Sequence, residues 1–382
     1  MRLGRRGFVA SMLAAAASAR SALSAAGSLA ATNQRQARMP APTAALGIPG
    51  PYRGRVVSVY HPACIVSGQY QAEPVRQMIA KGMMELTGAP SPAEAWRAFF
   101  GPGDVVGIKL NPVGQPYVIS APEVLREIIE GLKQAGVKPR DIVAYDRFRR
   151  EFLSAGFDKW LPEGVRWTAG SERGGLFQLD MDGYDPDHYM EMALVLPGAD
   201  PRNPHHRRSY VAKFLTKEVN KMVNLGVLKH HQSAGVTLAL KNMSHGLVNN
   251  VSRSHISRSL NVCGAFIPAV VDLPVIRQKV VLHILDGVQG AYHGGPGRRV
   301  GKYMWEHKTM YFATDPVAMD RIGWEVIDQK RAEKGMAPVA LANPDPDSIF
   351  LNPQPEHIEL AGALGLGEAD ESKISWRKFT LS

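Results

Sequence analysis

Several short apolar runs of this 382-residue chain end in polar side chains that could take part in chemistry. Lys109 and Asn111 end one run, Asp146 ends a second, the Lys-His-His of 229–231 ends a third, and Asp286 ends a fourth. If these runs are parallel strands, their carboxyl ends lie along one edge, and ligands bind outside that edge. The set therefore predicts one polar pocket, although any single member taken alone is better explained as an ordinary solvated strand end or helix cap.

The segment 229–245 holds the highest density of reactive side chains. If its second half is helical, Lys241 and His245 share one face because they are four residues apart. Free backbone N–H groups at the start of such a helix attract an anion. We expect Lys109, Lys229 and Lys241 to supply the positive charge that binds it.

His231 is the preferred catalytic side chain, because imidazole titrates near neutral pH and suits general acid–base catalysis. Asp286, with Asp146 or Asp315, is expected to orient this histidine or to hold a cation. A divalent metal held by His231, His245 and Asp286 is a further hypothesis. A spacing of 14 positions from His231 to His245 is not a recognised ligand spacing, and a hydrogen-bonded structural histidine is the alternative.

A glycine-rich segment, residues 286–302, follows the last of these apolar runs. Its backbone could approach a phosphate or carboxylate closely, and its arginines would add positive charge. The spacing fits neither a Walker loop nor a dinucleotide-binding fingerprint, so a lid over the pocket and a plain loop both remain open. The complete expected substrate-binding set is Lys109, Asn111, Asp146, Lys229, Lys241, Asn242, Gly295, Gly297 and Asp315.

Alternating strands and helices must position these residues. The expected strands are 55–60, 104–111, 141–146, 221–228, 279–286, 310–313 and an edge strand at 374–379, and the expected helices are 73–86, 121–135, 234–247 and 316–331. Ser120 and Asp315 are the expected N-caps of the second and fourth helices. Strand–helix–strand order implies parallel pairing. We therefore expect an α/β fold, a mostly parallel sheet with flanking helices, in a single domain over 54–382 with an irregular insertion at about 147–210.

Composition excludes several classes of protein. Hydrophobic residues make up 45% of the chain and charged residues 21%, which is the globular range. Two cysteines, Cys64 and Cys263, are too few for a disulfide scaffold or a self-supplied iron–sulfur cluster, and whether they pair is left open. Eight arginines in residues 1–72 carry most of the net charge of +10. The remainder is almost neutral, so we expect no nucleic-acid partner.

The N-terminus has the pattern of an export signal. Arg5 and Arg6 precede a weakly apolar, alanine-rich run with small residues near its end. It resembles a twin-arginine signal, although Gly4 stands where Ser or Thr is usual; an organelle transit peptide is the alternative. We expect a signal at 1–30 that engages export machinery, a linker at 31–53, a bacterial periplasmic or otherwise exported location, and no stable membrane span.

The body resembles the domain-of-unknown-function family numbered 362. The motifs that carry the resemblance run in family order and lie at 107–111, 227–231, 235–242, 284–287, 294–297 and 313–320. The family usually has Lys-Thr-His where this chain has residues 229–231, which makes His231 the matching histidine. Some relatives carry ferredoxin-type cysteine motifs, so the resemblance implies a redox partner. This chain lacks those motifs, and the family transfers no general activity.

The sequence therefore predicts an exported α/β protein, an enzyme acting on a small anionic substrate at the strand ends, with metal assistance as an option. The alternative is a non-catalytic periplasmic protein that binds a ligand in the same pocket or assists the maturation of a partner.

Overall fold

The computed structural model describes residues 46–172, 174–175, 177–342 and 348–382. The expected signal at 1–30 and most of the expected linker at 31–53 lie outside the described residues. Within them, no helix is both long enough and apolar enough to cross a membrane. Both cysteines are described, and neither forms a disulfide.

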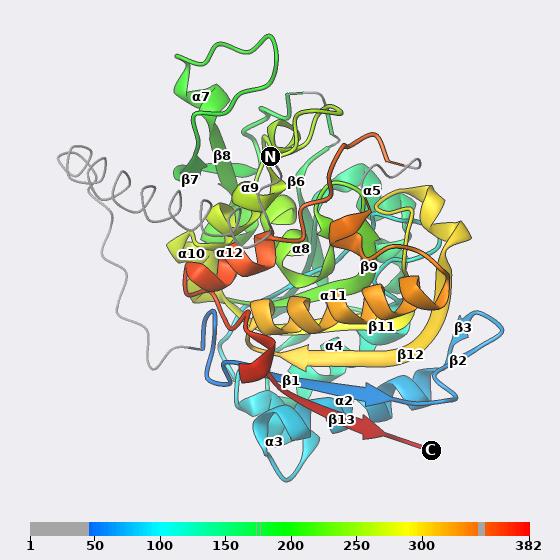
Figure 1. Ribbon diagram of the computed structural model, residues 1–382. Helices are drawn as coiled ribbons and strands as arrows, with labels where there is room; N and C mark the ends of the chain where they lie inside the picture. Colours follow the sequence, from blue (N-terminus) through cyan, green and yellow to red (C-terminus); the bar gives the residue numbers. More distant parts are fainter. Residues whose placement is uncertain (1–45, 173, 176, 343–347) are drawn as a thin grey trace. The chain divides into compact units, whose positions relative to one another are not determined.

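A nine-stranded sheet organises the described residues (Figure 1). Its strands run in the order β13-β1-β12-β11-β9-β4-β5-β6, with β10 paired to β9. Within this order β12 is antiparallel to both of its neighbours, β1 and β11, and every other adjacent pair is parallel; β10 is antiparallel to β9. The strands are β1 (Arg55–Tyr60), β4 (Val106–Lys109), β5 (Ile142–Phe148), β6 (Arg166–Ser171), β9 (Lys221–His231), β10 (Gly235–Val236), β11 (Val280–Ala291), β12 (Met304–Ala313) and β13 (Ser375–Thr380). The expected mostly parallel α/β fold is confirmed.

Helices cover both faces of the sheet, and each face has its own apolar core. Successive strand residues point to opposite faces, so Val56 packs in one core and Val57 in the other. One core receives α2 (Ala72–Thr87), α3 (Pro92–Arg97), α4 (Pro122–Gln134), α5 (Arg149–Ser154) and α6 (Phe157–Trp160). The other receives α8 (Leu238–Leu247), α9 (Cys263–Val271), α10 (Pro274–Lys279), α11 (Pro316–Glu333) and α12 (His357–Ala363).

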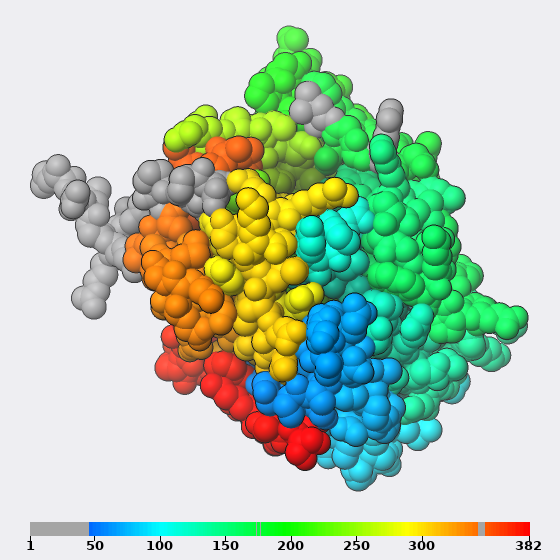
Figure 2. All heavy atoms as spheres, turned by 90° about the vertical axis from the view of Figure 1, so that its right-hand side faces the viewer, coloured from blue at the N-terminus to red at the C-terminus, as the bar shows by residue number. Residues whose placement is uncertain are grey.

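Smaller elements lie outside the main sheet and its covering helices. They are the hairpin β2 (Ile65–Val66) and β3 (Gln69–Tyr70), the pair β7 (Tyr184–Glu191) and β8 (Arg208–Ala212), the helix α7 (Pro204–Arg207), and the helical turns η1 (Pro139–Asp141), η2 (Phe214–Glu218), η3 (Ser252–Ser254), η4 (Arg298–Lys302), η5 (Val339–Leu341) and η6 (Glu371–Lys373). The segment before α2 lies beside β12, blue against yellow in Figure 2, and Lys308 of β12 donates through Nζ to Pro62 O.

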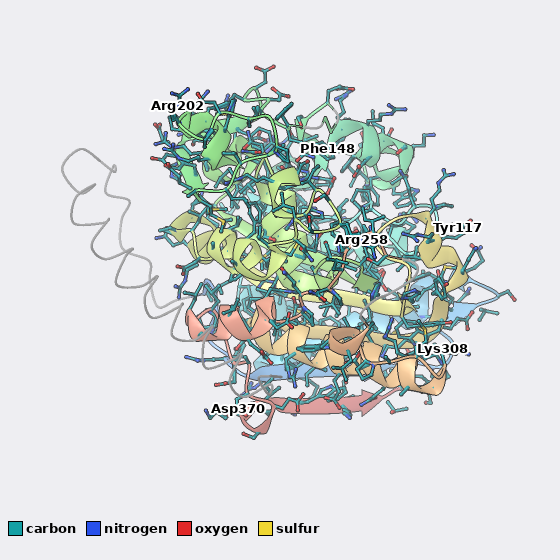
Figure 3. The ribbon with its side chains drawn as sticks, turned by 45° about the horizontal axis from the view of Figure 1, so that its top comes forward. Tyr117, Phe148, Arg202, Arg258, Lys308 and Asp370 are labelled. Atoms are coloured by element: carbon teal, nitrogen blue, oxygen red, sulfur yellow. The ribbon has the colours of Figure 1, made fainter. Side chains whose placement is uncertain are left out.

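The segment expected to be an irregular insertion, 147–210, is more regular than its composition indicates. It contains α5, α6, β6, β7 and α7, and β6 forms one edge of the main sheet. Trp167 of β6 stacks on Phe152 of α5 with ring centroids 4.8 Å apart, which fastens this edge strand to the helix layer. In Figure 3, Arg202 of this segment and Asp370, which precedes β13, lie at opposite ends of the view.

Helix starts differ from the sequence expectation at two places. Ser120 does not cap α4; its hydroxyl accepts from the backbone N–H of Asn111 at 2.9 Å and donates to Leu225 O at 3.3 Å. α8 begins at Leu238, four residues later than expected, because residues 235–236 first pair back onto β9. Asp315 does cap α11, as expected, by accepting from two N–H groups of its first turn.

Candidate functional site

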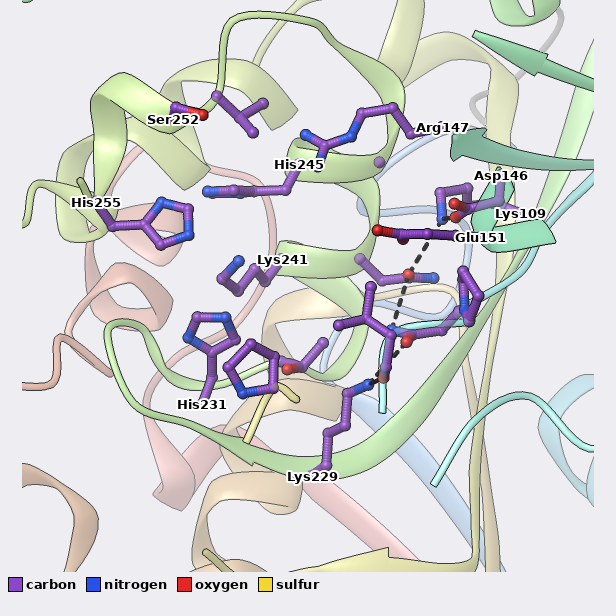
Figure 4. Close-up of a pocket in the computed structure, with 18 of the residues that line it drawn as sticks. Lys109, Asp146, Arg147, Glu151, Lys229, His231, Lys241, His245, Ser252 and His255 are labelled. Atoms are coloured by element: carbon purple, nitrogen blue, oxygen red, sulfur yellow. Dashed lines mark hydrogen bonds and ion pairs between the residues drawn. The ribbon is translucent and has the colours of Figure 1, made fainter. Parts of the chain in front are cut away.

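A cavity of about 270 Å³ lies at the carboxyl ends of β4, β5 and β9, beneath α8 (Figure 4). It brings together eight of the residues expected from the sequence, which are Lys109, Asn111, Asp146, Lys229, His231, Lys241, Asn242 and His245. Strand ends supply the first five, and one face of α8 supplies the last three. Arg147, Glu151 and His255 also line the cavity.

One wall is a hydrogen-bonded network that neutralises a buried lysine. Lys109 Nζ lies 2.6 Å from Asp146 Oδ1 and 3.4 Å from Asn242 Oδ1. Asn111 Nδ2 donates to the same Asn242 oxygen at 3.1 Å, and Asn242 Nδ2 donates to Asn224 Oδ1 at 2.7 Å. Burial lowers the pKa of Lys109, and the Asp146 carboxylate opposes that shift. The charge of Lys109 is therefore balanced within the protein.

Lys229 lies on the floor of the cavity and is fully buried. Its Nζ donates to Asn111 Oδ1 at 2.8 Å and to the carbonyl of Val113. Burial, together with the positive charges of Lys241 and Lys109, lowers the pKa of Lys229 to about 7. At neutral pH this amine is divided between its charged and uncharged forms, which allows it to exchange a proton.

Lys241 and Arg147 are cations without a hydrogen-bonding partner at the cavity. Lys241 is 7% exposed, and its Nζ forms no hydrogen bond or ion pair with any residue that the structure describes. Burial lowers the pKa of Lys241 to about 8. Arg147 Nη1 is likewise buried and makes no hydrogen bond within the described part of the chain. Because buried charges are normally paired, these two cations favour the binding of an anion in the cavity.

His231 is held in one tautomer by the backbone. Its Nδ1 accepts from the N–H groups of Ser233 at 3.2 Å and Ala234 at 3.3 Å, so the proton of the neutral ring sits on Nε2. Burial and the nearby Lys241 hold the pKa of His231 well below its usual value. In Figure 4 the Lys241 side chain lies between His231 and His255. This geometry suits His231 to donate a hydrogen bond through Nε2 rather than to accept a proton.

Asp286, expected to orient His231, does not line the cavity. It accepts from Tyr70 Oη and the Val288 N–H, each at 3.1 Å, and from the Ala121 N–H at 3.3 Å. Alternation along β11 explains its position, because Asp286 shares the α2–α4 face with Ile284. Asp286 therefore cannot act on His231, and the expected role is corrected. Burial raises the pKa of Asp286 to about 7.

Asp315, Gly295 and Gly297 also lie outside the cavity lining. The two carboxylate oxygens of Asp315 accept from four backbone N–H groups, those of Gly54, Val317, Ala318 and Glu368, so Asp315 ties chain segments together. Gly295 packs against the end of β9, where a Cβ atom would lie 1.7 Å from His230 O. Pro296 is the member of the glycine-rich loop that reaches the cavity.

The donor set for a metal differs from the expected one. Among the described residues, His245, His255 and Cys263 form a group in which one ligand atom from each lies within 4.8 Å of the others. Only His245 belongs to the expected set of His231, His245 and Asp286. The sequence does not predict His255 and Cys263 as ligands, because they follow no recognised ligand spacing. It does not predict Arg147 and Glu151 as cavity residues, because they begin the segment expected to be an irregular insertion.

Comparison with known proteins gives one informative match. The family described as a domain of unknown function, DUF362, matches residues 106–325. No curated protein matches the chain. A protein from Thermotoga maritima of known crystal structure has a TM-score of 0.32 at 10% identity, over 59% of this chain and 52% of its own, so this chain spans about half of that protein. A loganic acid methyltransferase with SAH has a TM-score of 0.26 at 10% identity, over 77% and 70% of the two chains. With more than half of its length matched, the chain belongs to the DUF362 family.

Proposed function

We propose that this protein is an α/β enzyme that acts on a small anionic molecule in the cavity beneath α8. The observation that carries the proposal is the ammonium group of Lys241, which is almost completely buried and has no partner among the residues that the structure describes. A buried charge without a partner is costly, and a carboxylate or phosphate bound beside it offsets the cost. The buried Nη1 of Arg147, which has no hydrogen-bond partner among the described residues, supports the same ligand chemistry.

The cavity volume supports a small substrate. At about 270 Å³ it falls below the range of roughly 300–1,000 Å³ that is common for pockets holding drug-sized ligands. A short organic acid or a small phosphorylated compound fits this space and charge.

The side chains suggest a division of roles. Lys241 and Arg147 bind the anionic group, and His231 donates a hydrogen bond through Nε2 to a substrate oxygen. Lys229, with a pKa of about 7, transfers a proton, because a general acid–base works best when its pKa is near the operating pH. Glu151 is a second proton-transfer group, since burial raises the pKa of its carboxyl.

Calorimetric titration with phosphate and with short mono- and dicarboxylates tests the anion site. We expect at least one of these anions to bind wild-type protein and to bind Lys241→Met at least tenfold more weakly. Lys133→Met is the matched control, because Lys133 is a half-exposed lysine of α4 that pairs with Glu130; it should leave the affinity unchanged. Equal affinity in all three proteins would overturn the proposal. Tight binding with no turnover of any bound compound would favour a ligand-binding protein instead.

We also propose that the protein is exported from a bacterial cytoplasm through a twin-arginine signal. The adjacent Arg5 and Arg6, ahead of an alanine-rich run without acidic residues, support this. A fusion of residues 1–53 to a reporter should reach the periplasm, and the double change Arg5→Lys and Arg6→Lys should block it. Export that is unaffected by the double change would count against this pathway.

A further inference from the structure

A cluster of two histidines and a cysteine lies at the end of the cavity bounded by α8. His245 lies in the last turn of α8, His255 directly follows η3, and Cys263 opens α9. A hydrogen bond of 2.7 Å from Val262 N to Ser254 O closes the intervening loop. The closed loop places Cys263 beside His255, although seven residues separate them in the sequence.

We propose that His245, His255 and Cys263 bind a divalent transition metal of the zinc class. One ring nitrogen from each histidine and the Cys263 sulfur lie within 4.8 Å of one another. Zinc bonds of about 2.0–2.3 Å to nitrogen and sulfur need these atoms somewhat closer together. Metal binding therefore draws the three side chains inward.

The hydrogen bonds of Ser254 prepare both imidazoles as ligands. Its hydroxyl has one proton, which the carbonyl of Val251 receives at 2.7 Å. The hydroxyl oxygen must then accept from His245 Nε2 at 3.0 Å and from His255 Nδ1 at 2.7 Å. One nitrogen of each neutral ring is thus protonated and fixed by Ser254. The other nitrogen of His255 keeps its lone pair, whereas His245 Nδ1 accepts from Ser244 Oγ at 3.0 Å, a hydrogen bond that the metal would replace. Metal-binding histidines are oriented by this kind of hydrogen bond.

The donor types select the class of metal. Two imidazoles and one thiolate suit zinc, cobalt or copper, whereas magnesium and calcium prefer oxygen ligands. The thiolate also reduces the charge that a divalent ion brings close to Lys241. Cys263 is fully buried and its sulfur lies 3.6 Å from Ser233 Oγ, so the thiolate would have a hydrogen-bond donor at hand.

Three protein ligands leave one coordination position open, as in catalytic rather than structural zinc sites. His245 and His255 both line the cavity, so the open position faces the space where the anion is proposed to bind. An oxygen of that anion could bind the metal while Lys241 pairs with its charge. This last role rests on the proposed function, whereas metal binding itself rests only on the three ligands.

Cobalt provides a direct test. Protein stripped of metal by a chelator is titrated with Co²⁺ while its absorption spectrum is recorded. We expect one ion per chain, with a thiolate-to-cobalt charge-transfer band and the strong visible bands of a tetrahedral site. Cys263→Ala should lose the charge-transfer band and weaken binding at least tenfold. Cys64→Ala, which removes the only other cysteine, should change neither.

Two further measurements test the metal site even if Cys263→Ala does not fold. His255→Asn alters a side chain that is only partly buried, so it should fold even if Cys263→Ala does not, and it should also weaken cobalt binding tenfold. Absence of stoichiometric binding, or a charge-transfer band that survives Cys263→Ala, would overturn the metal site. Anion binding by the metal-free protein, measured with and without Lys241→Met, reports on the proposed function separately.

Discussion

Lys109 and Asp146 form an ion pair in which the side chains are only 2% and 6% exposed and Nζ lies 2.6 Å from Oδ1. The pair joins the last residue of β4 to the neighbouring strand β5. Removing one member leaves a buried charge without compensation, which costs more than the intact pair contributes.

Lys109→Met should therefore destabilise the protein by about 3–5 kcal/mol. The double change of Lys109→Met with Asp146→Leu should recover most of that loss, because no unpaired charge remains. Urea unfolding monitored by circular dichroism measures both free energies. The exposed pair of Lys133 and Glu130 is the control, since surface pairs are worth about 0–1 kcal/mol. A Lys109→Met protein as stable as Lys133→Met would contradict the prediction.

Lys241→Met should stabilise the protein, in contrast to Lys109→Met. The Lys241 ammonium is buried without a partner among the described residues, so replacement by an apolar chain of similar length relieves a desolvation cost. We expect the free energy of unfolding to rise by about 1–3 kcal/mol at neutral pH in a buffer of large, weakly binding anions. Urea unfolding with and without the tightest-binding anion checks this. A destabilised variant under both conditions would show that Lys241 has a structural role instead.

Asp286 should make stability depend on pH. Its folded-state pKa of about 7 lies above the ordinary value of 3.8, so between these pH values the unfolded state binds fewer protons than the folded state. Stability therefore falls as the pH rises from about 4 to 7, by a total on the order of 4 kcal/mol for this group. Asp286→Asn should lack this decline. Unfolding free energies of both proteins at pH 4, 5.5 and 7 test the difference, and parallel curves would refute it.

The substitution Gly246→Ala should destabilise the protein. Gly246 lies in α8, and a Cβ atom there would meet Lys109 Cε at 2.0 Å. Overpacking of this kind typically costs about 1–3 kcal/mol, and displacing Lys109 should also weaken anion binding. Gly101→Ala is the control, because no atom lies within 4 Å of its added Cβ. Thermal unfolding and the anion titration measure the two effects; similar behaviour of the two variants would disprove the steric argument.

Local patterns were sufficient to predict the elements that position the site. The β-branched run 55–60 forms β1 with the expected bounds, and the apolar spacing of 73–86 forms α2 with one extra residue at each end. Asp315 followed by proline predicted the start of α11. These features follow from backbone propensity and side-chain periodicity, which act within one element.

The sequence by itself determined the α/β class, the strand ends and the lysines and histidines that meet there. Only the tertiary structure decided which face each polar side chain takes and which charges remain unpaired. Asp286 ends an apolar run as Asp146 does, yet β11 turns it toward α4 and away from the cavity. Lys109 and Lys241 look alike in the sequence, but one has a carboxylate at 2.6 Å and the other has no partner among the described residues. Pairing depends on contacts between residues distant in the chain, which no local spacing encodes.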